Sequence, residues 1–214
     1  MDVTRPARSI IGSDQADRST LGGCNMTCQV DKDISELAAR CTEGIIMIQI
    51  YTGNGKGKTT ASLGLIIRAL GQEKKVCLIQ FMKKNFEYGE IKFLSKQDGL
   101  DIFQFGTAQL VNPENPSKID FEEAEKAYDK CKEIIASNNY DIIVIDEINV
   151  AVKWKLIPLE KQIELMEMDT DAEIIMTGRY AKNEVLHCAS LVTEMKEIKH
   201  YYVLGVEARK GIEF

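Results

Sequence analysis

The chain has 214 residues, of which 44% are hydrophobic and 28% charged, and its formal net charge is −6 at pH 7. This length suits one α/β domain with a full core and a short appendage. The acidic balance argues against a nucleic-acid partner, because such proteins need a basic face that displaces counterions from phosphates. No apolar run reaches the roughly 18 residues of a membrane span, so no membrane partner is expected either.

The beginning of the chain differs from the rest because it is rich in Ser, Thr, Asp and Gly. We predict that residues 1–44 form a flexible arm or a leader, with one short helix-like piece at 31–42. Because the start lacks the apolar stretch of a secretory signal, we expect a cytoplasmic protein with free thiols. A compact domain is expected over 45–214.

The six cysteines fall into two groups. Cys24, Cys28 and Cys41 lie in the arm and raise the hypothesis of a metal or iron–sulfur site. The usual zinc pattern needs four ligands, and the arm offers three cysteines and no histidine, so incidental thiols are the favoured interpretation. The remaining three are expected to be buried, reduced thiols in strands or helices, namely Cys77, Cys131 and Cys188.

From Ile45 onward, strand and helix patterns alternate. Strands are expected at 45–51, 75–81, 100–105, 140–146 and 172–177, with short ones near 191–193 and 201–204. Helices are expected at 57–70, 89–95, 120–137, 158–167 and 183–189, and Trp154 is interpreted as the anchor of a further helix after Asp146. Such alternation predicts an α/β fold with a mostly parallel sheet and helices on both faces.

Two of these helices have a clear apolar stripe. In the helix at 57–70 the stripe comprises Leu63, Ile66, Ile67 and Leu70. In the helix at 120–137 it comprises Phe121, Ala124, Tyr128, Cys131 and Ile135. We predict that this second helix starts with a capping box formed by Asp120 and Glu123.

A glycine-rich loop, Thr52-Gly53-Asn54-Gly55-Lys56-Gly57-Lys58-Thr59-Thr60, joins the first strand to the first helix. In this context glycines let backbone N–H groups converge on phosphate oxygens, and the helix N-terminus adds partial positive charge. Lys58 is expected to neutralise phosphate charge, and the Thr59 hydroxyl to bind Mg²⁺. The spacing is atypical, because Thr52 stands where the first glycine is usual and Lys56 is an additional cation. The loop predicts binding of ATP.

Polar residues follow three further strands. Asp146 and Glu147 end the fourth strand, where carboxylates of phosphate-loop proteins hold Mg²⁺ or its waters. Arg179 follows the fifth strand at the same edge of the sheet and could clamp a polyphosphate, although a surface arginine is an equal alternative. Lys83 and Lys84 follow the second strand and invite the same role, with an exposed loop as the competing interpretation. His187 and His200 have no metal-ligand spacing.

Several motifs together resemble one family. From about Ile48 to the end, the chain looks like a P-loop ATP:corrinoid adenosyltransferase, with a P-loop NTPase (RecA-like) fold. The matching pieces are the glycine loop, Gln80-Phe81-Met82-Lys83 with Gly89-Glu90, Ile145-Asp146-Glu147, Ile175-Met176-Thr177-Gly178-Arg179, Lys199-His200 and the terminal Gly205-Val206 and Lys210-Gly211-Ile212-Glu213-Phe214.

The resemblance implies that Co(I) of a reduced corrinoid attacks the 5′ carbon of ATP and that the whole triphosphate leaves. It implies catalytic roles for Lys58, Glu147 and Arg179. Nucleotide-binding residues would be Gly53, Asn54, Gly55, Lys56, Gly57, Lys58, Thr59, Thr60, Lys83 and Arg179. The metal, Mg²⁺ or Mn²⁺, would be held by Thr59, Asp146 and Glu147.

The resemblance further implies a homodimer, an electron donor such as a flavoprotein, and a corrinoid substrate (cobalamin, cobyrinic acid diamide or cobinamide). Family members enclose the corrinoid face with aromatic side chains of a Gly-Thr-Gly-Phe-Thr-Trp stretch. The corresponding segment here reads Gly106-Thr107-Ala108-Gln109-Leu110-Val111, so aliphatic Leu110 and Val111 would exclude water. Two alternatives remain open: a kinase or ATPase acting on the γ-phosphate, and a non-catalytic ATP-binding regulator.

Overall fold

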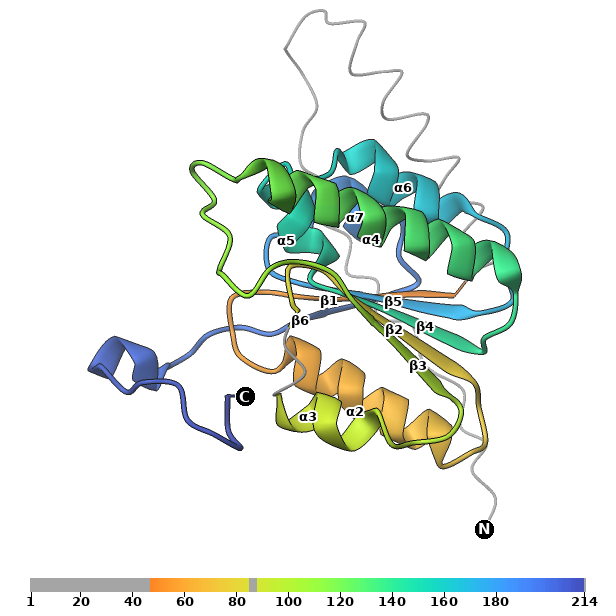
Figure 1. Ribbon diagram of the computed structural model, residues 1–214, viewed down its shortest axis with the longest axis horizontal. Coiled ribbons are helices and arrows are strands. Elements are labelled where there is room, and N and C mark those ends of the chain that lie inside the picture. Colours follow the sequence, from red (N-terminus) through yellow and green to blue (C-terminus); the bar gives the residue numbers. More distant parts are fainter. Residues whose placement is uncertain (1–46, 85–87, 214) are drawn as a thin grey trace, which may run out of the picture.

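A computed structural model describes residues 47–84 and 88–213 (Figure 1). The predicted arm at 1–44, its helix at 31–42, the thiols Cys24, Cys28 and Cys41, and the first two residues of the predicted strand at 45–51 lie outside the described residues.

The sheet has six strands in the order β3-β2-β4-β5-β1-β6, and every pairing is parallel. Their bounds are β1 Ile48–Thr52, β2 Val76–Gln80, β3 Leu100–Gln104, β4 Ile142–Asp146, β5 Glu173–Thr177 and β6 Leu191–Glu194. Because all strands run the same way, their carboxyl ends lie along one edge of the sheet. The predicted α/β fold with a parallel sheet is confirmed.

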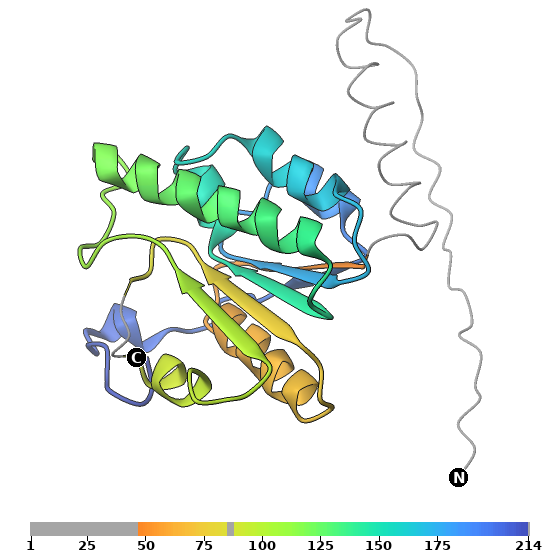
Figure 2. The same ribbon diagram turned by 45° about the vertical axis from the view of Figure 1, so that its right-hand side comes forward.

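Helices cover both faces of the sheet (Figures 1 and 2). Helices α2 (Lys58–Leu70) and α3 (Gly89–Leu94) lie on one face. The other face carries α4 (Lys118–Ser137), α5 (Ile148–Lys153), α6 (Leu159–Glu167) and α7 (Asn183–Cys188). Within the described residues, no helix is both long and apolar enough to cross a membrane.

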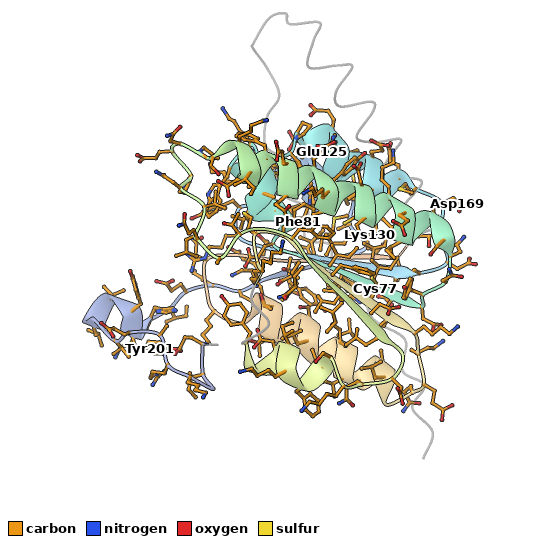
Figure 3. All side chains as sticks on the ribbon, viewed as in Figure 1. Cys77, Phe81, Glu125, Lys130, Asp169 and Tyr201 are labelled. Atoms are coloured by element: carbon orange, nitrogen blue, oxygen red, sulfur yellow. The ribbon has the colours of Figure 1, made fainter. Side chains whose placement is uncertain are left out.

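Two apolar clusters hold these layers together, one on each face of the sheet, and side chains fill the space between the layers (Figure 3). Strand β2 is buried along its whole length, because its alternate residues face opposite clusters: Cys77 and Ile79 pack toward α4, and Val76 and Leu78 toward α2. Cys77, Cys131 and Cys188 are buried free thiols, as predicted.

The structure corrects four details of the sequence interpretation. Residues 201–204 form a 3₁₀ helix, η1 (Tyr201–Leu204), rather than a strand, because no described strand lies beside them to pair with. Helix α4 starts at Lys118, and its capping box joins Ser117 to Asp120, whose carboxylate accepts the Ser117 backbone N–H at 2.8 Å. Ile67 (54% exposed) and Phe121 (42%) lie at stripe margins, each about 100° around the helix from a buried neighbour.

Candidate active site

The polar residues predicted to act together gather at the carboxyl edge of the sheet. Asp146 ends β4, Thr177 ends the adjacent β5, and Gln80 ends β2 on the other side of β4. The glycine loop leaves β1, beyond β5, and turns into α2. Parallel pairing thus brings the ends of four strands together within one site.

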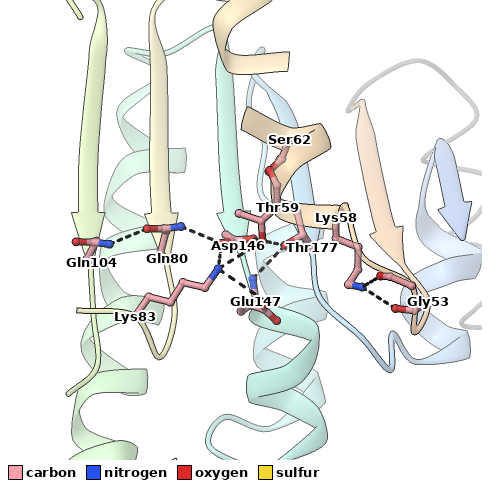
Figure 4. Close-up of polar contacts among 11 residues, drawn as sticks. Gly53, Lys58, Thr59, Ser62, Gln80, Lys83, Gln104, Asp146, Glu147 and Thr177 are labelled. Atoms are coloured by element: carbon pink, nitrogen blue, oxygen red, sulfur yellow. Dashed lines mark hydrogen bonds and ion pairs between the residues drawn. The ribbon is translucent and has the colours of Figure 1, made fainter. Parts of the chain in front are cut away.

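Asp146 is the centre of this edge, and its side chain is fully buried (Figure 4). Four donors saturate its two carboxylate oxygens. Oδ1 accepts the hydroxyls of Thr59 at 3.0 Å and Thr177 at 2.5 Å, and Oδ2 accepts the amide of Gln80 at 2.9 Å and the ammonium of Lys83 at 2.7 Å. Burial acts against the charged form, but Lys83 and these hydrogen bonds outweigh it, so the pKa of Asp146 is lowered.

A chain of amides continues from Asp146 away from the loop. The Gln104 side-chain amide at the end of β3 donates to Gln80 Oε1 at 2.8 Å, which leaves the Gln80 amide free to donate to Asp146. Because Gln80 is itself fully buried, this chain holds the Asp146 carboxylate in one orientation.

Lys83 brings a positive charge to the oxygens predicted to hold a metal. Its Nζ lies 2.7 Å from Asp146 Oδ2, 3.4 Å from Thr59 Oγ1 and 3.9 Å from Glu147 Oε1. Burial opposes the ammonium form, but the charges of Asp146 and then Glu147 outweigh it and raise the pKa of Lys83. Lys84, by contrast, points to α4, with its Nζ 3.9 Å from Glu123, so the two adjacent lysines have different roles.

Glu147 occupies a strained backbone position beside Asp146. It is the N-cap of α5 with φ +66°, a left-handed conformation that costs energy for a residue with a side chain. The Thr177 hydroxyl accepts the Glu147 backbone N–H at 3.1 Å while it donates to Asp146, so Thr177 positions both carboxylate residues. Burial first, and the Asp146 charge second, raise the pKa of Glu147.

Lys58, the first residue of α2, is buried at the base of the glycine loop. Its ammonium donates to the carbonyl oxygens of Gly53 and Gly55, both at 2.7 Å. Burial lowers the pKa of Lys58, and the positive charge of Arg179 adds to this effect, whereas Glu147 and Asp146 oppose it. Lys58 thus closes the loop on itself, with other cationic and anionic groups of the site close by.

The chain after β6 explains two glycines of the loop. Gly55 N–H donates to Met195 carbonyl oxygen at 2.6 Å, so this N–H faces the protein and is not directed at a ligand. A Cβ on Gly53 would lie 2.5 Å from that same oxygen, and one on Gly55 2.7 Å from it. Gly53 and Gly57 also have φ of +94° and +119°, which favour glycine, and at Gly57 only the Met195 sulfur lies near.

Lys56 also turns toward the end of the chain. Its Nζ donates to Ile212 carbonyl oxygen at 2.9 Å, to Glu213 Oε1 at 3.0 Å and to Tyr201 Oη at 3.4 Å. The additional cation of the loop is therefore engaged by the C-terminal segment rather than pointing freely into solution.

Arg179 is exposed and follows a tightly supported turn. Asn149 Nδ2 donates to Gly178 carbonyl oxygen at 3.1 Å, and Gln162 Nε2 donates to Asn149 Oδ1 at 2.8 Å. Gly178 has φ +128°, and a Cβ there would lie 3.1 Å from the Asn149 Cβ. Helices α5 and α6 thus hold the backbone that presents Arg179.

Several of these groups line one cavity of about 1000 Å³. Of the predicted site residues, Gly55 to Thr60, Lys83, Glu147 and Arg179 line it, whereas Gly53, Asn54 and Asp146 do not. Apolar and aromatic side chains also line it, among them Leu110, Val111, Val150, Trp154 and Tyr180. The cavity therefore offers both charged groups suited to polyphosphate and apolar surface suited to a large ring system.

Sequence reasoning missed several residues of this site. Trp154, interpreted as a helix anchor, both packs against the core and lines the cavity. Tyr180 lines the cavity next to Arg179, and His200 lines it from the C-terminal segment. The positions of Gln80 and Thr177 at strand ends were the available signal for their role, since they share the edge with Asp146.

The oxygens around Lys83 also fit a hard divalent cation. Two carboxylates and a hydroxyl are ligand types that Mg²⁺ prefers. The Lys83 ammonium lies among these oxygens, where the positive charge of the ion would be. Among the described residues, no group of three or more His, Cys, Asp and Glu side chains could hold a metal alone. Phosphate oxygens of a nucleotide would have to complete the coordination.

Comparison with known proteins identifies the family. A profile of the family described as "ATP:corrinoid adenosyltransferase BtuR/CobO/CobP" matches residues 45–214. A corrinoid adenosyltransferase of Sinorhizobium sp is 34% identical over 172 residues, which cover 78% of this chain and 80% of that protein. One of Escherichia coli K12 is 32% identical over 187 residues, which cover 87% of this chain and 92% of that protein.

Proposed function

The chain belongs to the ATP:corrinoid adenosyltransferase family, and from this premise we propose how its residues perform the reaction. A reduced corrinoid attacks the 5′ carbon of ATP with the Co(I) electron pair, a cobalt–carbon bond forms, and the bond from that carbon to the triphosphate oxygen breaks. The observation that carries the proposal is one cavity that both cationic and apolar side chains line.

The charged end receives the triphosphate, which is the leaving group. Lys58 exchanges its two carbonyl partners for phosphate oxygens, and the N-terminus of α2 adds the partial charge of its free N–H groups. Arg179 lies on the same cavity and adds a bidentate donor set. These cations stabilise charge that grows as the triphosphate leaves, and no general base is required because the nucleophile is a metal centre.

Mg²⁺ bound with the nucleotide would be held by Thr59, Asp146 and Glu147. When bound, the ion supplies further neutralisation of the leaving triphosphate. Lys83 contacts the same three oxygens, so with the ion bound there its ammonium would be available to the phosphates. Asp146 keeps its other partners, Gln80 and Thr177, and therefore keeps its orientation.

The apolar wall receives the corrinoid. Leu110 is 96% exposed, and Val111 and Trp154 line the same cavity. A solvent-exposed leucine at a cavity rim gains about 1.5–3 kcal/mol when a ligand buries it fully, so this wall excludes water from the cobalt face without the aromatic pair of other family members. The proposal further includes that the protein is a homodimer in the cytoplasm and that a flavoprotein supplies the electrons that reduce the corrinoid.

A product analysis separates this function from a kinase or ATPase. ATP, Mg²⁺ and chemically reduced cobalamin are mixed with the protein in the dark, and the products are separated by chromatography. We expect triphosphate and a light-sensitive adenosylcobalamin in equal amounts. ADP and phosphate without adenosylated corrinoid would establish a γ-phosphate reaction instead, and ATP binding with neither product would indicate a regulator.

A further inference from the structure

The C-terminal residues contain a motif that the reaction does not use. Lys210-Gly211-Ile212-Glu213 closes the described chain, and Gly211, Ile212 and Glu213 line the same cavity as the glycine loop. In Figure 1 the segment after β6 leaves the sheet, forms η1 and turns back toward the site. The segment at 195–213, here called the C-terminal strap, therefore contributes one wall of the site.

The strap contacts the loop at two places. At its beginning, Met195 carbonyl oxygen accepts the Gly55 N–H, and Met195 N–H donates to Thr52 carbonyl oxygen at 2.8 Å. At its end, Glu213 and the Ile212 carbonyl accept the Lys56 ammonium. The loop is thus held from both ends of the strap.

Glu213 is the point on which the end of the strap converges. Its carboxylate accepts the backbone N–H of Arg209 at 2.8 Å and the Arg209 guanidinium at 3.3 Å, and it accepts the Tyr201 hydroxyl. The Arg209 guanidinium also lies over the Tyr201 ring, 4.8 Å from its centroid. The side chain of Glu213 is only 19% exposed, so one carboxylate joins η1, the turn at 209–213 and the loop cation.

We propose that the C-terminal strap is a positioning element for the nucleotide loop and that Glu213 is the residue that sets the place of the Lys56 ammonium. Lys56 has three N–H donors, and all three have partners on the strap. The strap therefore holds this cation at the cavity, where its charge attracts the triphosphate without the entropic cost of ordering a free lysine side chain.

The inference rests on the proposed use of the cavity for ATP. It distinguishes Lys56 from Lys58: Lys58 is held by the loop itself, whereas Lys56 depends on residues more than 150 positions away in the chain. Removing Glu213 should therefore weaken ATP binding through Lys56 alone, although Glu213 is an anion and would by itself repel the triphosphate. Its loss would strengthen binding if simple charge repulsion decided the outcome.

A double-mutant cycle tests the proposal. Lys56→Met, Glu213→Gln and the double variant are compared with the wild-type chain for ATP affinity, followed by fluorescence of Trp154, the one tryptophan of the chain. Each single variant should weaken ATP binding about 3- to 10-fold, and the double variant should be no weaker than Lys56→Met, because coupled residues are not additive. The KM for ATP should rise while kcat changes less than about two-fold.

Controls separate positioning from general effects. Glu207→Gln removes a strap carboxylate to which no contact with the loop is assigned and should bind ATP as the wild-type chain does. Lys56→Arg, which keeps the cation, should recover most of the affinity. Tighter ATP binding by Glu213→Gln, or independent additive losses in the double variant, would overturn the proposal.

A second readout does not depend on the reaction. Hydrogen exchange of the nucleotide-free chain should be faster at residues 209–213 and at Gly55 in Glu213→Gln than in the wild-type chain. Unchanged exchange there would also contradict the proposal. If the wild-type chain makes no adenosylated corrinoid, the proposed reaction fails, while exchange and ATP affinity still decide the role of the strap.

Discussion

Two lysine–carboxylate pairs flank the glycine loop, and they differ in how the fold holds them. Lys83 and Asp146 meet at 2.7 Å with side chains 24% and 0% exposed, whereas Lys56 and Glu213 meet at 3.0 Å with side chains 42% and 19% exposed. Asp146 ends an interior strand, and Glu213 lies at the end of a long excursion from the sheet edge.

This difference gives the two pairs different roles, one in the stability of the fold and one in the positioning of a cation. A buried pair that loses one partner leaves an uncompensated charge in a low-dielectric surrounding, which is strongly destabilising. A pair with one half-exposed partner, such as Lys56 and Glu213, is partly screened by water and contributes less to folding. We therefore expect the first pair to be required for the folded site, and the second to place a cation without affecting the stability of the domain.

The largest expected effect is that of Asp146→Asn. The amide cannot neutralise Lys83, and it cannot accept all four donors, so the free energy of unfolding should fall by about 3 kcal/mol. Activity should be lost as well. Urea unfolding measures this change. Glu213→Gln is the more exposed counterpart, and its free energy of unfolding should stay close to that of the wild-type chain. A loss of less than about 1 kcal/mol for Asp146→Asn would show that the two pairs do not differ as described.

Lys58→Ala should affect catalysis more than folding. Removal of the buried ammonium takes away a preorganised charge at the triphosphate, which costs about 100- to 1000-fold in rate at comparable sites. The rate of adenosylcobalamin formation measures this loss, and the circular dichroism spectrum should match that of the wild-type chain. Full activity of the variant would refute the role of Lys58.

Lys83→Met should increase metal affinity in the absence of nucleotide. The ammonium competes for the oxygens of Asp146, Glu147 and Thr59, and two unit charges at about 4 Å interact by about 4 kcal/mol at an effective dielectric constant of 20. We expect Mn²⁺ to bind the variant at least about ten-fold more tightly, measured by the electron paramagnetic resonance of free Mn²⁺. Lys84→Met is the matched control, and equal Mn²⁺ affinity in all three proteins would argue against a shared site.

The smallest effect is a pH-dependent gain in stability for Glu147→Gln. Burial and then the Asp146 charge raise the pKa of Glu147 in the folded chain. An acid with a raised folded-state pKa stabilises the fold fully below its unfolded pKa, about 4.3, and this contribution is lost as the pH rises through the folded-state pKa. The variant should therefore exceed the wild-type chain by up to about 1 kcal/mol at pH 7 and by less near pH 4.

Urea unfolding at both pH values measures this difference. Glu90→Gln serves as its control, because Glu90 lines the same cavity from α3. A difference between Glu147→Gln and the wild-type chain that does not vary with pH would contradict the assignment of the effect to ionisation of Glu147.

Much of the site could be predicted because strand ends converge. Asp146 and Thr177 were recognisable as ends of apolar runs, and a parallel sheet brings such ends to one edge. Gln80 stood one residue before the end of its predicted strand and was missed. Local patterns did not predict what lies across that edge. Trp154 was correctly expected near a helix, but its contact with the cavity depends on how α5 packs, and that packing has no signature in the spacing of residues.

The glycine loop shows what the sequence determines and what only the tertiary structure decides. By itself the sequence determined that residues 52–60 join a buried strand to a helix, and it predicted a phosphate loop there, since glycines, Lys58 and Thr59 in that context have a local physical meaning. Only the tertiary structure decided why Gly53 and Gly55 are glycines and which way Lys56 points. Both depend on backbone atoms of Met195 and Ile212, and contacts between such distant residues arise only when the sheet is complete.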